Sequence, residues 1–288
     1  MKCIRLYLFF SFSLTWLIWI SIINFEFSYT LYWILMYISV FMPAIALGVT
    51  KILTKNEKIL FVSLKLQFSE NIKWYLIAWL FPVVITFLGG FLYYCTFQND
   101  FDFTFGWLQQ EIINNTGQFT DNPIIVANRK ILVAILISPF VNTFLCLGEE
   151  IGWRGFLFPA LTQHISRNKT HIVVGIIWGI WHTPLIIMGN NYGLGYIGYP
   201  WLGVFTLCIF TFSTGVFLSW LTENTLTIWP AALAHGTINS LGGLPYLFIS
   251  SIDTSKRLLG PGITGVISGL PMIVLALILI ISEKQLRN

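Results

Sequence analysis

The stretch LYLFFSFSLTWLIWISII at residues 6–23 decides the fold class, because it carries no charged side chain. A helix rises about 1.5 Å per residue, and apolar runs of about 18 residues or more mark helices that cross a bilayer. Lys2 and Arg5 precede the run, as in a secretory signal, but no small-residue cleavage site follows it. We therefore expect a retained first membrane-spanning helix.

The composition of the whole chain agrees with that stretch. Of 288 residues, 56% are hydrophobic and 10% are charged, and the mean hydropathy is +0.76. Soluble domains carry about 25% charged residues, so this chain lacks the charge to cover a water-facing surface. The apolar runs are continuous rather than alternating, which indicates helices. We predict an all-α, polytopic transmembrane helix bundle that forms one integral membrane domain, residues 1–288.

Further apolar runs raise the expected number of spanning helices to about eight. The expected spans are 4–23, 30–50, 74–97, 131–150, 172–188, 201–221, 226–249 and 262–282. Lys and Arg gather in alternate connections, which predicts cytoplasmic N- and C-termini, although Lys256 and Arg257 oppose that pattern. Residues 98–130 should form an external cap. For the basic stretch 51–73, an amphipathic surface helix and a solvated loop are equally open.

Charge and cysteine content exclude several kinds of partner and site. The net charge is +4, and the basic residues lie in short connections, so we expect membrane lipid and no nucleic acid as a partner. The cysteines form no C-x-x-C motif and are read as small packing residues. They are Cys3, Cys95, Cys146 and Cys208.

Three polar clusters interrupt the apolar second half of the chain. They read Glu149-Glu150-Ile151-Gly152-Trp153-Arg154, then Trp178-Gly179-Ile180-Trp181-His182, then His235-Gly236-Thr237-Ile238-Asn239. Ionisable residues inside membrane spans are costly and usually face the bundle interior, where they mark functional sites.

Helical spacing relates the side chains within each cluster. Glu150 and Arg154 are four residues apart and can pair, and His235 and Asn239 share a face in the same way. Glu149 points about 100° away from Glu150, toward a different neighbour. If the three helices surround one cavity, four side chains converge there: Glu149, His182, His235 and Asn239.

This set of side chains suits the hydrolysis of an amide. A carboxylate beside an imidazole can hold and deprotonate a water molecule. A second imidazole and a carboxamide can donate hydrogen bonds to a developing oxyanion. The sequence contains no G-x-S-x-G or H-E-x-x-H motif, and no Asp falls within an expected span. A serine, cysteine or aspartyl mechanism is therefore unsupported.

The three clusters resemble the motifs of the CAAX-protease and bacteriocin-processing family of intramembrane proteases, which includes the type II CAAX prenyl endopeptidase. The family pattern is E-E-x-x-x-R, then aromatic-x-x-x-H, then H-x-x-x-N, and this chain matches all three in order. The resemblance covers about residues 130–242, the expected core of the domain. It implies that Glu149 activates the water with the assistance of His182.

The resemblance also implies roles for the remaining motif residues. His235 and Asn239 would form the oxyanion site, and Glu150 and Arg154 would brace the motif or position the substrate. Family members have been described both as metalloproteases and as metal-free enzymes. A zinc site would need His182, His235 and the carboxylate of Glu149. We expect the metal-free version, with no required cofactor.

Each motif residue has a plainer interpretation by itself, as interfacial charge or as a hydrogen bond between helices. Together they favour an intramembrane endopeptidase that cleaves a peptide or membrane-protein substrate near the cytosolic face of a bacterial membrane, such as a bacteriocin leader. The first alternative is a non-catalytic bacteriocin-immunity or scaffold protein of the same fold. The second is a small-solute transporter, which should show an internal repeat that we do not find.

Overall fold

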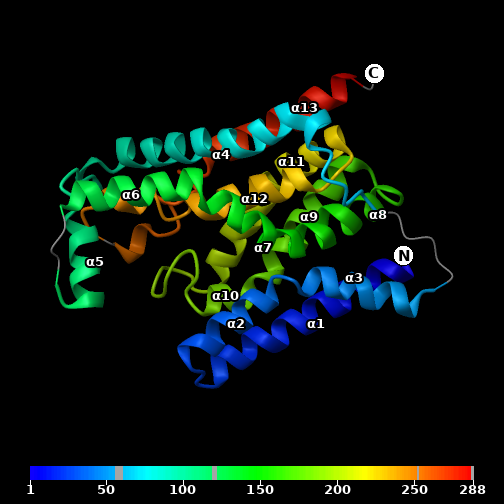
Figure 1. The fold of residues 1–288 in the computed structure, drawn as a ribbon, viewed down its shortest axis with the longest axis horizontal. Coiled ribbons are helices and arrows are strands. Elements are labelled where there is room, and N and C mark those ends of the chain that lie inside the picture. Colours follow the sequence, from blue (N-terminus) through cyan, green and yellow to red (C-terminus); the bar gives the residue numbers. More distant parts are fainter. Residues whose placement is uncertain (56–60, 119–121, 252, 287–288) are drawn as a thin grey trace.

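The computed structural model is a bundle of helices in which α1, α2 and α3 form a layer along one side (Figure 1). It describes residues 1–55, 61–118, 122–251 and 253–286. These residues contain no β-strand, and only two isolated bridges join extended segments, Ser63 to Thr227 and Phe101 to Ile249. The predicted all-α class is confirmed.

The helices differ widely in length. The three longest are α1 (Lys2–Asn24), α4 (Phe68–Thr96) and α11 (Trp201–Thr225). The others are α2 (Tyr29–Ser39), α3 (Met42–Leu53), α5 (Gly106–Thr116), α6 (Pro123–Leu136), α7 (Ser138–Gly152), α8 (Phe158–Thr162), α9 (Arg167–Trp181), α10 (Thr183–Ile187), α12 (Trp229–Leu241) and α13 (Leu270–Leu286). Short 3₁₀ turns lie at Gln98–Asp100, Pro245–Phe248 and Thr254–Lys256.

Fewer helices than expected are long enough to cross a membrane. Among the described residues, α1, α4 and α11 are each long and apolar enough to cross a membrane. They agree with the spans predicted at 4–23, 74–97 and 201–221. Two bent pairs raise the number to five if each is one span. They are α2 with α3, bent by 52°, and α6 with the helices from Ser138 to Thr162, bent by 49°.

Three of the eight predicted spans, at 172–188, 226–249 and 262–282, coincide with helices that are too short to meet this length criterion. The 13 residues of α12 reach only about 20 Å, against a hydrocarbon core of roughly 30 Å. α9 ends at Trp181 and gives way to the five-residue α10, and the apolar part of α13 covers Leu270–Ser282. Apolar composition alone does not distinguish such helices, buried among others, from full spans.

The helices that carry the motifs pack at very close range. α12 packs chiefly against α7 and α4, and α11 against α9 and α13. A Cβ added at Gly236 of α12 would lie 2.6 Å from the backbone nitrogen of Thr143 in α7. A Cβ at Gly179 of α9 would lie 2.6 Å from the Cys208 sulfur in α11. Both glycines therefore allow backbone approach that any side chain would prevent.

The two long connections behave differently from each other. In the stretch 51–73, α3 ends at Leu53, and residues 56–60 lie outside the described part. Residues 61–67 form no helix, and Val62 N–H is bonded to the Gly155 carbonyl. An amphipathic surface helix is thus wrong for residues 61–67. The region 98–130 instead contains α5 and the start of α6.

The two chain termini lie at the same end of the bundle, and α5 lies at the opposite end (Figure 1). We call these the terminal end and the distal end. α9 begins at the terminal end, where Arg167 pairs with Glu223 near the end of α11. α12 also begins there, because the Trp229 indole donates to the Leu64 carbonyl.

Candidate active site

The three motifs occupy positions where regular helix ends or changes. Glu149 and Glu150 lie in the last turn of α7, and Arg154 follows in a short π-helical segment, Trp153–Leu157. π-Helical segments are rare in proteins, and those that occur often lie at functional sites. His182 terminates α9, whereas His235 lies in the middle of α12. The structure brings all three motifs together.

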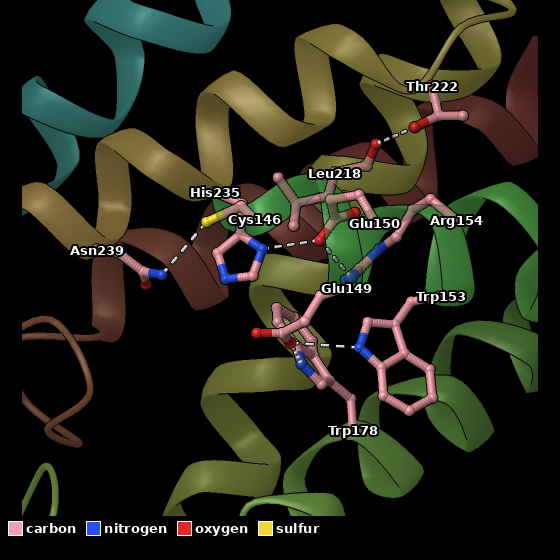
Figure 2. Close-up of polar contacts among 10 residues, drawn as sticks. All are labelled: Cys146, Glu149, Glu150, Trp153, Arg154, Trp178, Leu218, Thr222, His235 and Asn239. Carbon is pink, nitrogen blue, oxygen red and sulfur yellow. Dashed lines mark hydrogen bonds and ion pairs between the residues drawn. The ribbon is translucent and has the colours of Figure 1, made fainter. Parts of the chain in front are cut away.

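Glu150 is the centre of a buried ionic network (Figure 2). Its Oε1 accepts a hydrogen bond of 3.1 Å from Arg154 Nη1 and lies 2.8 Å from His235 Nδ1. Glu150 and Arg154 are essentially inaccessible, at 0% and 1% exposure, and His235 is buried as well. The pair expected from the spacing of Glu150 and Arg154 therefore forms, and His235 joins it from α12.

Glu149 has a different kind of environment, made of neutral donors. Its Oε2 accepts from the Trp178 indole N–H at 2.7 Å and from the Trp153 indole N–H at 3.3 Å. Its Oε1 bonds to none of the described residues and points away from both indoles (Figure 2). The side chain is 5% exposed. Two donors from different helices thus fix one oxygen and leave the other available.

His182 has one nitrogen fixed and one free. Its Nδ1 lies 2.8 Å from the Trp178 carbonyl, and because a carbonyl only accepts, Nδ1 carries the proton. In the neutral ring the lone pair is then on Nε2. The ring stacks on Trp19 of α1 at 6.2 Å and meets Trp181 edge-on at 4.8 Å. No hydrogen bond joins His182 to Glu149 among the described residues, although both contact Trp178.

Asn239 is the most open member of the set. Its side chain is exposed, and its Nδ2 contacts the buried Cys146 sulfur at 3.4 Å, one turn before Glu150 on α7. His182 is only partly buried. Both residues lie toward the C-terminal ends of helices that begin at the terminal end of the bundle. The accessible side of the site therefore faces the distal end.

Trp178 links the whole arrangement, and the sequence predicted no role for it beyond the aromatic position of its motif. Its indole donates to Glu149, its ring stacks under the Arg154 guanidinium at 4.2 Å, and His235 meets it edge-on at 5.2 Å. Trp153 and Cys146 were also missed. The spacing of four residues between Glu149 and Trp153 could have indicated that contact, whereas the contacts of Trp178 depend on how the helices meet.

The zinc set considered from the sequence does not assemble. Within the described part of the chain, no group of three or more His, Cys, Asp or Glu side chains is placed to hold a metal ion. His235 Nδ1 bonds to Glu150, Glu149 Oε2 accepts from the Trp178 indole, and His182 Nδ1 lies against the Trp178 carbonyl. We therefore derive no step through a metal.

Comparison with known proteins supports the motif assignment. Residues 129–241 match a family described as type II CAAX prenyl endopeptidase Rce1-like. A curated protein named CAAX prenyl protease 2, from Methanococcus maripaludis, is 36% identical over 94 residues. That match covers 32% of this chain and about a third of the relative, 34%. The resemblance carried by the three motifs is confirmed, over nearly the same residues as predicted.

Proposed function

We propose that the protein is an intramembrane endopeptidase in which Glu149 activates a water molecule that attacks a peptide bond. One observation carries the proposal: Glu149 is buried among apolar helices, held on Oε2 by two indole N–H groups, and open on Oε1. Glu150 also leaves one oxygen, Oε2, without a partner, but that oxygen is shielded from solvent and the other faces the Arg154 guanidinium and His235.

The proposed reaction uses one proton acceptor and a separate set of hydrogen-bond donors. Glu149 Oε1 takes a proton from water as the water oxygen bonds to the peptide carbonyl carbon, and the carbonyl oxygen becomes an oxyanion. The same carboxyl group then gives the proton to the departing amine as the C–N bond breaks. His182 Nε2 holds the water as a second acceptor. All atoms of water end in the two products, one carboxyl and one amine.

The oxyanion needs donors on the accessible side of the site. Asn239 Nδ2 is the most exposed donor of the motif residues, and only a weak contact with Cys146 occupies it. His235 lies one turn before Asn239 on α12. Its Nδ1 contacts Glu150, so Nε2 is the nitrogen that remains for the oxyanion. Glu150 and Arg154 touch neither water nor substrate in this scheme, so we assign them to positioning His235 and the turn after α7.

Cleavage of a peptide library by the purified protein in detergent, read by mass spectrometry, tests the proposal. Wild type, Glu149→Gln and His182→Ala are compared, each with and without a chelator. Wild type should cleave, both variants should be severely impaired, and the chelator should not reduce the rate, since we propose a metal-free reaction. Folded wild type that cleaves nothing would favour the immunity or scaffold alternative. Equal cleavage by all three proteins would indicate a contaminating protease.

The membrane orientation is a separate part of the proposal. We place both termini in the cytoplasm, because the terminal end carries most of the basic connections. The accessible side of the site would then face away from the cytosol, unlike the expectation of cleavage near the cytosolic face. Labelling of a single cysteine introduced at exposed Lys55 or Gln98, with a membrane-impermeant maleimide on intact cells, distinguishes the two orientations.

A further inference from the structure

A large basic cavity lies at the distal end, beyond the C-terminal end of α12. Its volume is about 690 Å³, and its lining includes Arg129 and Lys130 of α6, Glu111 of α5, and Arg257. This volume falls in the range of cavities that bind small ligands or short peptide segments. The mechanism above uses none of these four residues.

The cations of this cavity lack acidic partners. Among the described residues, no ion pair joins Arg129, Lys130 or Arg257 to a carboxylate, although the neighbouring Lys256 is paired with Asp100 at 2.8 Å. Three cations face a single carboxylate, Glu111. Positive charge concentrated in a concave site attracts anionic groups more strongly than the same charge on a flat surface.

Arg257 is the best-held of the three cations. It is partly buried, and its Nε is shielded from solvent and bonds to none of the described residues. Its guanidinium lies against the backbone of Gly193, where an added Cβ would come within 3.3 Å of Cζ. Arg129 and Lys130 are exposed at the rim. The cavity thus combines one partly buried guanidinium with two exposed cations.

The cavity adjoins the candidate active site along α12. Ser240 lines it, follows Asn239 directly, and accepts a hydrogen bond of 3.0 Å from Asn142 of α7. Ser240 lies five positions after His235, which is about 7.5 Å along a helix. A chain of a few residues bound in the cavity can therefore continue to Glu149 from the accessible side.

We propose that this cavity binds a carboxylate-bearing segment of the peptide substrate, with Arg257 as the principal contact and Arg129 and Lys130 at the rim. The inference rests on the proposed function, because it takes the ligand to be the peptide that Glu149 cleaves. The carboxylates belong to Asp or Glu side chains, or to the C-terminus of the peptide; guanidinium and ammonium groups recognise both.

Binding of fluorescent peptides to the full-length Glu149→Gln protein in neutral detergent, measured by anisotropy, tests the inference without requiring cleavage. The probes are a decapeptide with three Glu residues and its counterpart with Gln at the same positions, each with a free and an amidated C-terminus. The Glu peptide should bind about ten-fold more tightly at low salt, and the difference should shrink as salt is added. Tighter binding of the free-acid Gln peptide over its amide would assign the contact to the C-terminus.

The triple variant Arg129→Gln, Lys130→Gln, Arg257→Gln, placed on the same background, should remove this preference and leave the affinity for the amidated Gln peptide within about two-fold. Arg5→Gln, an exposed arginine at the terminal end, is the matched control and should retain the preference. A preference that survives in the triple variant would overturn the inference. So would an equal loss of affinity for all four peptides, which would assign the cations to lipid headgroups or to the fold. Charge-dependent binding without cleavage by wild type would instead refute only the proposed peptidase activity.

Discussion

Two adjacent carboxylates, Glu149 and Glu150, occupy opposite kinds of environment. Glu150 faces the ionic side, with Arg154 Nη1 at 3.1 Å and His235 Nδ1 at 2.8 Å on one oxygen. Glu149 faces the aromatic side, where two indole N–H groups fix one oxygen. The first environment neutralises charge. The second orients a carboxylate and provides no countercharge of its own.

The difference indicates a division of labour within one turn of helix. Removal of one partner of a buried ion pair lowers the stability strongly, because the other charge is then left buried and unpaired. Glu149 is held on Oε2 by neutral donors, and its Oε1 remains available to accept a proton. Loss of Glu150 should therefore reduce stability first, and loss of Glu149 should reduce activity first.

The largest expected effect on stability belongs to Glu150→Gln. It leaves the Arg154 guanidinium buried without its countercharge, which should cost about 3–5 kcal/mol of unfolding free energy. Thermal unfolding in detergent measures the loss. Glu223→Gln is the matched control, because it breaks the more exposed pair with Arg167 and should cost less than about 1 kcal/mol. Equal losses in the two variants would remove the bracing role assigned to Glu150.

Asn239→Ala should have the next largest effect, on activity alone. Removal of one donor to the oxyanion lowers kcat by about 10²-fold or more in enzymes that use such a site. The exposed position of Asn239 predicts little change in the unfolding midpoint. Steady-state cleavage of the best library peptide measures kcat. An unchanged kcat would exclude Asn239 as an oxyanion donor.

Trp178→Phe should lower kcat by roughly ten-fold with a smaller change in KM, because it removes the 2.7 Å bond to Glu149 and keeps an aromatic ring. Trp153→Phe removes the longer bond of 3.3 Å and should lower kcat by about three-fold or less. The reverse order of the two variants would contradict the geometry at Glu149 Oε2.

The sequence predicted which motif side chains lie near one another better than it predicted the partners of each side chain. The spacing of Glu150 and Arg154 was sufficient to predict their pairing, because residues four apart on a helix face the same way. The grouping of three distant motifs came from resemblance to a family and not from spacing. The partner of His235 was not predicted, since the contact with Glu150 depends on how closely α12 approaches α7 at Gly236.

The membrane spans show the corresponding limit for the fold. Hydropathy predicted α1, α4 and α11 correctly, because a long apolar helix has no other way to satisfy its backbone in lipid. It predicted a longer helix than α12, which ends at Leu241 and whose residues are mostly buried. A run of apolar residues indicates burial but does not by itself give the length of the helix that carries it.

The most direct test of the central claim measures kcat and the unfolding midpoint for Glu149→Gln and Glu150→Gln in parallel, beside wild type. Glu149→Gln should retain a near wild-type midpoint and lose about 10²- to 10⁴-fold in kcat, the usual contribution of a general base. Glu150→Gln should unfold at a distinctly lower temperature. A Glu149→Gln protein that unfolds early, or that cleaves at the wild-type rate, would contradict the assignment of Glu149 as the proton acceptor.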